Sequence, residues 1–295
     1  MGTAWGHNGV VAQATPNDRP DIPLRRDSAK ARVLSYSSGR AALKSDRITG
    51  EEPMQVRAAG PGQDPLDVAV TMRTPGSDFA LAVGFLFTEG LIEPDSVLRV
   101  AYCDDLAGDQ RYNVVTVRLD RPLSEGSQRN FYATSSCGVC GKASLDQVEQ
   151  SCPAVAPGPA VQAETLLRLP GRLRTAQRVF EHTGGLHAAG LFDPDGGLVS
   201  VKEDVGRHNA VDKVVGEAYL GGELPLAERV LLVSGRAGFE IVQKAAMAGI
   251  PVVCAVSAPS SLAVDVARRL GMTLVGFLRG ESFNVYAGED RIGGL

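Results

Sequence analysis

The sequence predicts an α/β protein, and two observations lead to that expectation. Between residues 230 and 277, short apolar runs of strand length alternate with segments of helical periodicity, and a glycine follows each helical segment. This β-α-β-α-β order predicts a parallel portion of sheet with right-handed crossovers. In the first half of the chain, predicted strand pairs surround one helical segment, which is typical of an α+β region. The 295 residues suffice for one large domain or two ordinary ones.

The first half contains two predicted strand pairs and one helix. Residues 47–73 alternate apolar and polar side chains on both sides of Gly60-Pro61-Gly62, which predicts a hairpin. A helix is expected after Asp78, a favourable N-cap, because the apolar residues that follow have helical spacing. A second strand pair is predicted at residues 97–103 and 113–119.

The second half begins with a hairpin and a helix. Residues 186–192 and 198–201 are apolar runs that flank the turn sequence Asp193-Pro194-Asp195-Gly196-Gly197. Asp204 is expected to cap a helix that runs to about Leu220, where two glycines follow. The alternating β-α-β-α-β region comes next. Its strands are predicted at 230–233, 251–256 and 273–277 and its helices at 239–248 and 262–270.

Small, hydroxylic or cationic residues follow each of the three predicted parallel strands, at 234–236, 257–261 and 278–282. Parallel sheets bind ligands outside the carboxyl ends of their strands. Backbone N–H groups, helix N-termini and arginine side chains are the groups that bind phosphate. One such loop is typical of an ordinary tight turn, whereas three that converge favour a phosphorylated ligand.

The composition of the chain and of its segments predicts how the domains are divided and argues against two kinds of partner. Residues 1–27 contain Pro, Gly, Asn and Asp and lack the apolar core of a signal peptide, so a disordered tail is expected there. An α+β domain is expected at 28–130, a mobile loop and linker at 131–163, and an α/β domain at 164–295. The net charge of −4 argues against nucleic acid as a partner, and no stretch is long and apolar enough to span a membrane.

The five cysteines do not form the pattern of a disulfide scaffold, because their number is odd and only two lie close together. A reducing compartment is therefore expected, and we place the protein in the cytoplasm. Cys254 lies in an apolar run and is expected to be an inert core residue.

Cys137 and Cys140 form a C-x-x-C pair, which can ligate a metal, form a redox disulfide or carry sulfur. A zinc site needs further ligands, but a second C-x-x-C is absent and the spacing of the histidines matches no common zinc signature. The H-x-E and P-C-x-x-C motifs of zinc deaminases are absent as well. No permanently bound metal is therefore expected, and a zinc-dependent hydrolase is the least favoured function.

The redox and sulfur-carrier interpretations both remain open on the residues alone. Gly138 and Gly141 would give the loop the mobility that sulfur delivery requires. Lys142 can lower the pKa of a neighbouring thiol, which favours the nucleophilic thiolate. A second thiol can attack a persulfide and help to release its sulfur.

From about residue 47 to its end, the sequence resembles the FdhD family, the sulfur carrier proteins that formate dehydrogenase needs for activity. The resemblance rests on blocks spread along the chain. These are Met72-Arg73-Thr74-Pro75-Gly76, Gly84-Phe85-Leu86 with Glu89-Gly90-Leu91-Ile92, Ser135-Ser136-Cys137-Gly138-Val139-Cys140-Gly141, Thr183-Gly184-Gly185-Leu186-His187, residues 203–213, Ser234-Gly235-Arg236, Val242-Gln243-Lys244, residues 257–263, and Gly276-Phe277 through Asn284-Val285-Tyr286.

The resemblance implies a function and a fold. Such proteins take sulfur from a cysteine desulfurase as a cysteine persulfide. They pass it to the molybdenum (or tungsten) bis(molybdopterin guanine dinucleotide) cofactor before that cofactor enters formate dehydrogenase. The second half would adopt a cytidine-deaminase-like α/β fold without its zinc chemistry. Cys137 would carry the persulfide, and Cys140 would assist it.

The resemblance also implies a cofactor-binding segment. Arg279 and the Gly280 N–H suit the phosphates of the cofactor, and Glu281 would either accept hydrogen bonds from a guanine or lie solvated on the surface. The whole segment comprises Phe277, Leu278, Arg279, Gly280, Glu281 and Ser282.

His208 and Asp212 are expected to pair on one helix face, with Arg207 and His208 as candidates to lie near the ligand. A non-catalytic chaperone that only binds the molybdenum cofactor is the alternative function. A homodimer is the assembly suggested by analogy with the two guanine arms of the cofactor.

Overall fold

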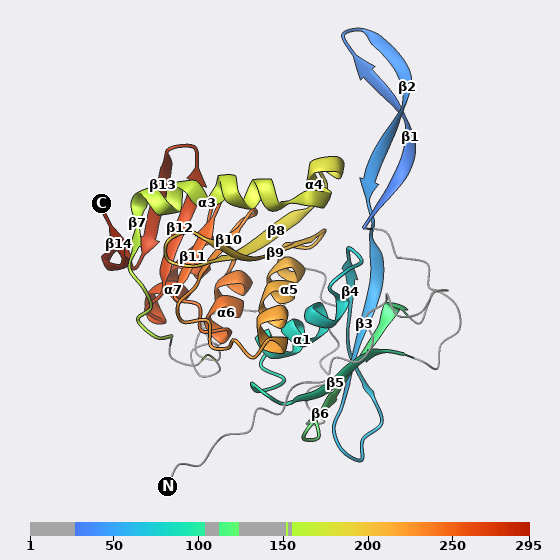
Figure 1. Ribbon diagram of the computed structural model, residues 1–295, viewed down its shortest axis with the longest axis vertical. Coiled ribbons are helices and arrows are strands. Elements are labelled where there is room, and N and C mark those ends of the chain that lie inside the picture. Colours follow the sequence, from blue (N-terminus) through green and yellow to red (C-terminus); the bar gives the residue numbers. More distant parts are fainter. Residues whose placement is uncertain (1–26, 104–111, 124–151, 153–154) are drawn as a thin grey trace.

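A computed structural model of the chain describes residues 27–103, 112–123, 152 and 155–295. Figure 1 shows a six-stranded sheet with helices on both faces, a smaller four-stranded sheet beside it, and a two-stranded ribbon that projects outward. In the described part of the chain, no helix is both long and apolar enough to cross a membrane.

The N-terminal part is built from two separate sheets. The first is the antiparallel ribbon of β1 (Ser28–Ser37) and β2 (Arg40–Thr49). The second has the order β4-β3-β6-β5 and contains both predicted strand pairs. Its strands are β3 (Glu52–Ala59), β4 (Leu66–Arg73), β5 (Val97–Tyr102) and β6 (Val114–Leu119).

The large sheet has the strand order β13-β12-β11-β10-β8-β9. Strands β10, β11 and β12 are parallel to one another, which confirms the predicted β-α-β-α-β arrangement. The hairpin of β8 and β9 adds to β10 through β8, which runs antiparallel to both neighbours. The strands are β8 (His187–Phe192), β9 (Leu198–Asp204), β10 (Val230–Val233), β11 (Val252–Ala255), β12 (Thr273–Arg279) and β13 (Ser282–Ala287).

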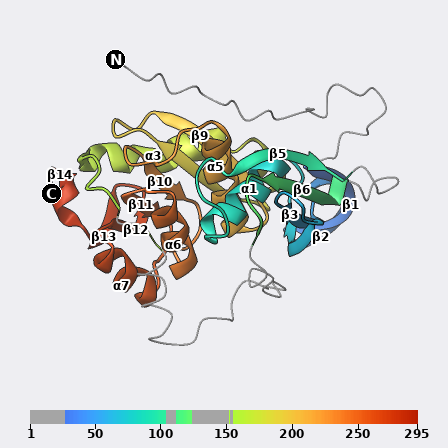
Figure 2. The same ribbon diagram turned by 90° about the horizontal axis from the view of Figure 1, so that it is seen from below.

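Helices cover the two faces of this sheet unequally. One face packs against α3, whose Leu166, Leu169 and Leu173 share a core with Phe192 and Cys254. The other face packs against α5, α6 and α7, and α1 extends that core toward the small sheet (Figure 2). The helices are α1 (Asp78–Thr88), α3 (Ala163–Ala176), α4 (Arg178–Thr183), α5 (Arg207–Leu220), α6 (Phe239–Met247) and α7 (Ser261–Arg269).

The remaining elements lie at the C-terminal end of the chain. A short parallel pair joins β7 (Val161–Gln162) to β14 (Ile292–Gly293), and a 3-10 helix (Glu289–Arg291) precedes β14. Cys254 is fully buried, and burial raises the pKa of its thiol to about 12, so it is the inert core residue that the sequence predicts.

Three local expectations were wrong. Asp204 is the last residue of β9 and does not cap α5, whose N-cap is Gly206. Asp78 is the first residue of α1, and Ser77 takes the N-cap position. Strand β12 continues past Phe277 to Arg279 and turns back into β13, so the third strand leads into a hairpin instead of the expected loop.

Helices α1 and α5 cross at a point where glycine is required. A Cβ on Gly84 would lie 1.8 Å from the carbonyl oxygen of Asp212, and a Cβ on Gly216 would lie 1.8 Å from that of Ala80. Because both obstacles are backbone atoms, no side-chain rotation can relieve them. The two backbones therefore approach closely only because neither helix carries a side chain there.

Gly84→Ala is therefore expected to destabilise the protein although alanine favours helices. Forcing the two backbones apart costs about 1–3 kcal/mol or slightly more in the free energy of unfolding. The matched control is Gly171→Ala in α3, where nothing lies within 4 Å of the new Cβ. That change is expected to be neutral or to stabilise by up to about 1 kcal/mol. Urea denaturation of both variants measures the difference, and equal stabilities would contradict the close crossing.

Candidate functional site

The carboxyl ends of β10, β11 and β12 lie at one edge of the large sheet, which we call the strand-end edge. The Ser257 N–H donates to the Gly235 carbonyl at 3.3 Å, and the Phe277 N–H donates to the Ser257 carbonyl at 3.1 Å. The first two segments predicted to converge are thus joined directly through their backbones, and the third follows Phe277 along the chain. Since β8 runs antiparallel to β10 and β9 antiparallel to β8, His187 and Asp204 lie at this edge too.

Three helices also begin at the strand-end edge, because α5, α6 and α7 follow β9, β10 and β11. Their first N–H groups give the edge a partial positive potential. Only α7 has its N-terminus capped by a side chain, the hydroxyl of Ser260, which accepts from the Ala263 N–H at 3.2 Å. The uncapped termini of α5 and α6 remain suitable for an anionic ligand.

His187 lies between the Ser234–Arg236 segment and the start of α5. A Cβ on Gly235 would lie 3.3 Å from His187 Nδ1 and 3.8 Å from Arg207 Cδ, so glycine lets the loop approach both side chains. Burial lowers the pKa of His187, and the charges of Arg207 and His208 lower it further, against an opposing effect of Asp204. The lowered pKa favours the neutral imidazole at this position beside the Arg207 guanidinium.

Arg207 has a buried Nε atom to which no described residue offers an acceptor. A buried N–H without a partner is costly, so an acceptor from a ligand would stabilise it. The neighbouring His208 pairs with Glu240, with 2.6 Å between Nε2 and Oε2, which corrects the expected pairing of His208 with Asp212. This close contact with His208 lowers the pKa of Glu240 and links the starts of α5 and α6.

The effect of Arg207 on His187 can be measured directly. In the wild type, the His187 imidazole is expected to be less than half protonated at pH 6.5, because its pKa is lowered. Arg207→Gln removes a nearby positive charge, so the pKa of His187 should rise toward its ordinary value. NMR titration of the imidazole resonances measures both values. Arg229→Gln, at the opposite end of β10, is the control and should leave the titration unchanged.

The segment 277–282 forms the tip of the β12–β13 hairpin at the far end of the same edge. Phe277 has a positive φ of 53°, and the pairing register shifts between Gly276 and Arg279, so the strand is bulged there. The guanidinium carbon of Arg279 lies 5.6 Å from the centre of the Phe277 ring. Gly280, Glu281 and Ser282 are exposed. Leu278 is fully buried in the core beneath α3, so its side chain faces away from solvent.

The strand-end edge is long. Three strand spacings separate β12 from β8, which corresponds to about 14 Å between the Phe277 end and the His187 end. A cavity of about 580 Å³ adjoins the β9 end and is lined in part by Leu186, Lys202 and Glu203. An elongated ligand can therefore contact both ends of the edge.

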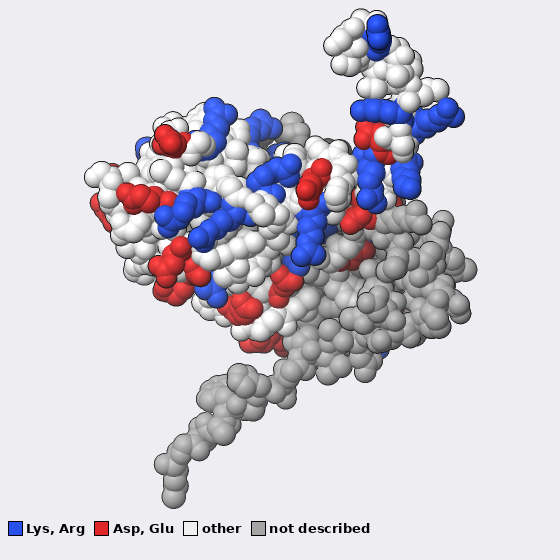
Figure 3. Space-filling model, turned by 45° about the horizontal axis from the view of Figure 1, so that its top comes forward, with Lys and Arg blue, Asp and Glu red and all other residues white. Residues whose placement is uncertain are grey.

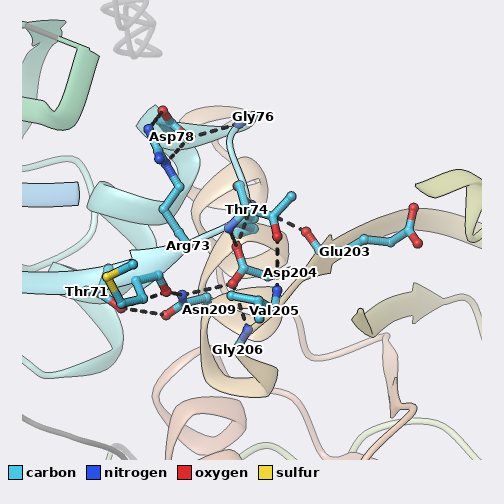
Figure 4. Close-up of polar contacts among 12 residues, drawn as sticks. Thr71, Arg73, Thr74, Gly76, Asp78, Glu203, Asp204, Val205, Gly206 and Asn209 are labelled. Carbon is cyan, nitrogen blue, oxygen red and sulfur yellow. Dashed lines mark hydrogen bonds and ion pairs between the residues drawn. The ribbon is translucent and has the colours of Figure 1, made fainter. Parts of the chain in front are cut away.

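Several sequence blocks that carry the resemblance have a structural role, as Figure 4 shows. Asp204 is fully buried and accepts hydrogen bonds from the Thr74 N–H at 3.1 Å and the Asn209 side chain at 2.9 Å. Lys213 Nζ lies 2.7 Å from Asp204 Oδ2 and donates to the Thr74 carbonyl at 2.8 Å. These contacts attach the end of β4 to the start of α5.

A second buried cluster surrounds Lys244 of α6. Its Nζ lies 2.9 Å from Asp212 Oδ1 and 2.8 Å from Glu89 Oε1, and it donates to the Thr88 hydroxyl at 2.9 Å. Burial opposes the charge of Lys244, but the two carboxylates outweigh it, so the pKa of the ammonium lies above its ordinary value. The cluster connects α1, α5 and α6, and sequence reasoning assigned none of these partners.

Cys137 and Cys140 lie outside the described residues, so the expectation of a mobile loop there stays a prediction. Within the described ranges, no three His, Cys, Asp or Glu side chains are grouped as ligands of a metal ion.

The chain is similar to known proteins over most of its length. The model of the FdhD/NarQ family matches residues 50–293. The sulfur carrier protein FdhD of Streptomyces avermitilis is 53% identical over 278 residues, which cover 91% of this chain and 97% of that relative. The proteins of the same name from Mycobacterium tuberculosis and Sulfurisphaera tokodaii are 52% and 43% identical, over 90% and 89% of this chain and 98% of each relative.

The fold is also similar to a solved structure. A crystal structure of a candidate formate dehydrogenase accessory protein from Desulfotalea psychrophila superimposes with a TM-score of 0.70 at 24% identity, covering 90% of this chain and 100% of that chain. This similarity confirms the fold class, a mixed α/β architecture with an α+β N-terminal part.

Proposed function

The chain belongs to the FdhD/NarQ family, and from this membership we propose that it is a sulfur carrier that serves formate dehydrogenase. The observation that carries the proposal is the identity of about half of all residues with proteins named as sulfur carriers, over about nine tenths of the chain. We further propose that Cys137 accepts sulfur from a cysteine desulfurase as a persulfide. The acceptor substrate is the molybdenum bis(molybdopterin guanine dinucleotide) cofactor.

The chemistry of loading follows thiol–disulfide exchange. The Cys137 thiolate attacks the terminal sulfur of the donor's persulfide, a new S–S bond forms on Cys137, and the donor cysteine leaves as a thiolate. Cys140 can then attack Cys137 Sγ, which expels the terminal sulfur as hydrosulfide and leaves a Cys137–Cys140 disulfide. A thiol reductant is needed to reduce that disulfide before the next cycle.

The strand-end edge supports a role in holding the acceptor cofactor. Arg279 and the Gly280 N–H offer donors for phosphate groups, and the Phe277 ring offers a face on which a guanine can stack. At the other end, Arg207 Nε lacks an acceptor and the starts of α5 and α6 favour negative charge. The cofactor is elongated and carries several phosphates, so it matches both the length and the charge of the edge.

Mass spectrometry tests the proposal. The protein is incubated with a cysteine desulfurase and cysteine, alkylated and digested. We expect a gain of one sulfur atom on the peptide that contains Cys137 and Cys140, and its removal by dithiothreitol. Absence of added sulfur from this peptide, with a desulfurase shown to be active on another acceptor, would reject persulfide carriage.

A cofactor chaperone without sulfur transfer is the second candidate. It is favoured by one observation, the set of donors at the strand-end edge, which could bind a phosphorylated ligand without any thiol. In that case Arg279→Ala should impair formate dehydrogenase activation while the cysteine variants remain active. Fluorescence or calorimetric titration with GDP, as a probe for the guanine and phosphate groups, measures binding at the edge independently of sulfur transfer.

A further inference from the structure

The β1–β2 ribbon extends from the protein as an exposed arm. Its ten residue pairs run from Ser28↔Thr49 to Ser37↔Arg40, and every residue of β2 except Thr49 is exposed. Figure 1 shows it projecting away from both larger sheets. Its base is fixed to the body, because a Cβ on Gly185 would lie only 2.6 Å from Thr49 Oγ1. A two-stranded ribbon by itself is only marginally stable in water, so a contact along one face would stabilise it.

The outer half of one face of the ribbon is apolar. Leu34 pairs with Leu43, and Tyr36 pairs with Ala41. Because side chains two residues apart on a strand share a face, these two pairs lie together. Leu34, Tyr36 and Leu43 are 68%, 74% and 60% exposed. Such a concentration of exposed apolar surface on one short face is typical of an interaction site.

The inner half of the same face is basic. Lys30 pairs with Arg47, and Arg32 lies on this face between that pair and the apolar half. The one acidic side chain of the ribbon, Asp46, pairs with Ala31 and belongs to the other face. In Figure 3, Lys and Arg side chains gather on the part of the ribbon nearest the body, and the outer part is mainly uncharged. We call the surface formed by Lys30, Arg32, Leu34, Tyr36, Leu43 and Arg47 the ribbon face.

The ribbon is hollowed where its basic and apolar halves meet. A cavity of about 430 Å³ is lined in part by Lys30, Arg32, Leu43 and Ser45. Ammonium, guanidinium and hydroxyl groups are donors that bind phosphate oxygens. A leucine beside them adds an apolar wall to the same cavity. This combination suits a phosphate group that is attached to an apolar chain, as in a phospholipid.

The two halves together indicate which anionic surface fits the ribbon face. A bilayer presents lipid phosphates above an apolar layer, so one surface meets both halves. Duplex nucleic acid would meet the cations but leave Leu34 and Leu43 in water. Residues 28–49 contain five Lys or Arg and one Asp, which leaves 25 cationic and 33 acidic residues, a formal net charge of −8, elsewhere. Attraction to an anionic surface is therefore concentrated in the ribbon, whose projection keeps the negative body at a distance where salt screens it.

We propose that the ribbon face binds the surface of an anionic phospholipid bilayer. Leu34, Tyr36 and Leu43 enter the boundary between headgroups and acyl chains, to a depth of about 5–10 Å. The tyrosine suits this boundary because its ring is apolar and its hydroxyl is polar. The cations of the inner half contact lipid phosphates. Such surface binding needs no membrane-spanning stretch, and it is independent of sulfur transfer, so it can fail or succeed on its own.

Co-sedimentation of the full chain with lipid vesicles tests the proposal. The wild type should bind vesicles in which about a third of the phosphatidylcholine is replaced by phosphatidylglycerol, and bind pure phosphatidylcholine far more weakly. Salt at about 1 M should release most of the protein, because the screening length falls to about 3 Å. Replacing Lys30, Arg32 and Arg47 together by Ala should lower the partition coefficient roughly 100-fold. Leu34→Ser with Leu43→Ser should lower it roughly 10-fold or more.

The opposite face of the ribbon supplies a matched control. Val33→Ser with Ile48→Ser removes the same number of apolar side chains from that face and should leave the partition coefficient within about threefold of the wild type. Circular dichroism establishes that all variants are folded. Four results would each overturn the proposal: no binding of the wild type to the anionic vesicles, unchanged binding by the two-leucine variant, an equal loss in the control, or tighter binding to duplex DNA than to the vesicles.

Discussion

Cys137→Ala is expected to reduce the activation of formate dehydrogenase by about 1,000-fold or more, because alanine cannot form the persulfide and loss of a nucleophile is among the largest single-residue effects. The assay reconstitutes a formate dehydrogenase lacking active cofactor with desulfurase, cysteine, cofactor and this protein, and follows formate oxidation. Thermal unfolding of the variant is measured beside that of the wild type, so that a loss of activity can be distinguished from a loss of folding.

The matched control for this variant is Cys103→Ala, which also removes one thiol. We expect it to retain activity, since Cys103 is buried at the edge of the small sheet and plays no part in the proposed relay. Cys140→Ala should load sulfur but release it more slowly. Full activation by Cys137→Ala would contradict the persulfide relay, and an accompanying loss in Arg279→Ala would establish the chaperone alternative.

Asp204→Ala is expected to have the largest effect on stability. The change leaves the Lys213 ammonium buried without its carboxylate and removes the acceptor for the Thr74 N–H and the Gly206 N–H. Removing one partner of a buried ion pair costs about 3–5 kcal/mol in the free energy of unfolding. Urea denaturation monitored by circular dichroism measures this loss.

Two further variants show whether the buried Asp204–Lys213 ion pair is responsible for the loss of stability. Asp265→Ala removes an exposed carboxylate from α7 and should change stability by less than about 0.5 kcal/mol. Lys213→Met in the Asp204→Ala background replaces the unpaired ammonium with an apolar side chain and should recover part of the loss. If Asp204→Ala lowers the free energy of unfolding by less than about 1 kcal/mol, the contact between β4 and α5 tolerates an unpaired Lys213.

The spacing of apolar residues correctly predicted those strands in which this spacing alone determines the buried face. The three parallel strands, the β3–β4 hairpin and the β8–β9 hairpin were confirmed because alternating or continuous apolar residues fix which face of a strand is buried. Helix α3 was not predicted, since Pro170 and Gly171 lie within it and disfavour a helix locally. Its leucines gain more from packing against the large sheet than those two residues cost.

The candidate site was predicted in part. The residues following β10 and β11 do converge, because adjacent parallel strands end at the same edge of the sheet. The third segment was placed correctly at that edge but assigned to a loop, whereas it belongs to a bulged hairpin. His187 reaches the edge only because β8 runs antiparallel to β10, and sequence periodicity does not specify strand order.

The amino-acid sequence by itself therefore determined the type of most elements, the inert character of Cys254 and the membership of the chain in its family. Only the tertiary structure decided the partners of the charged residues. Asp204 joins Thr74 across 130 residues of sequence, and Lys244 joins Thr88 across 156. The physical reason is that side-chain periodicity is a local property, whereas a buried charge must be satisfied by whichever distant segment the fold packs against it.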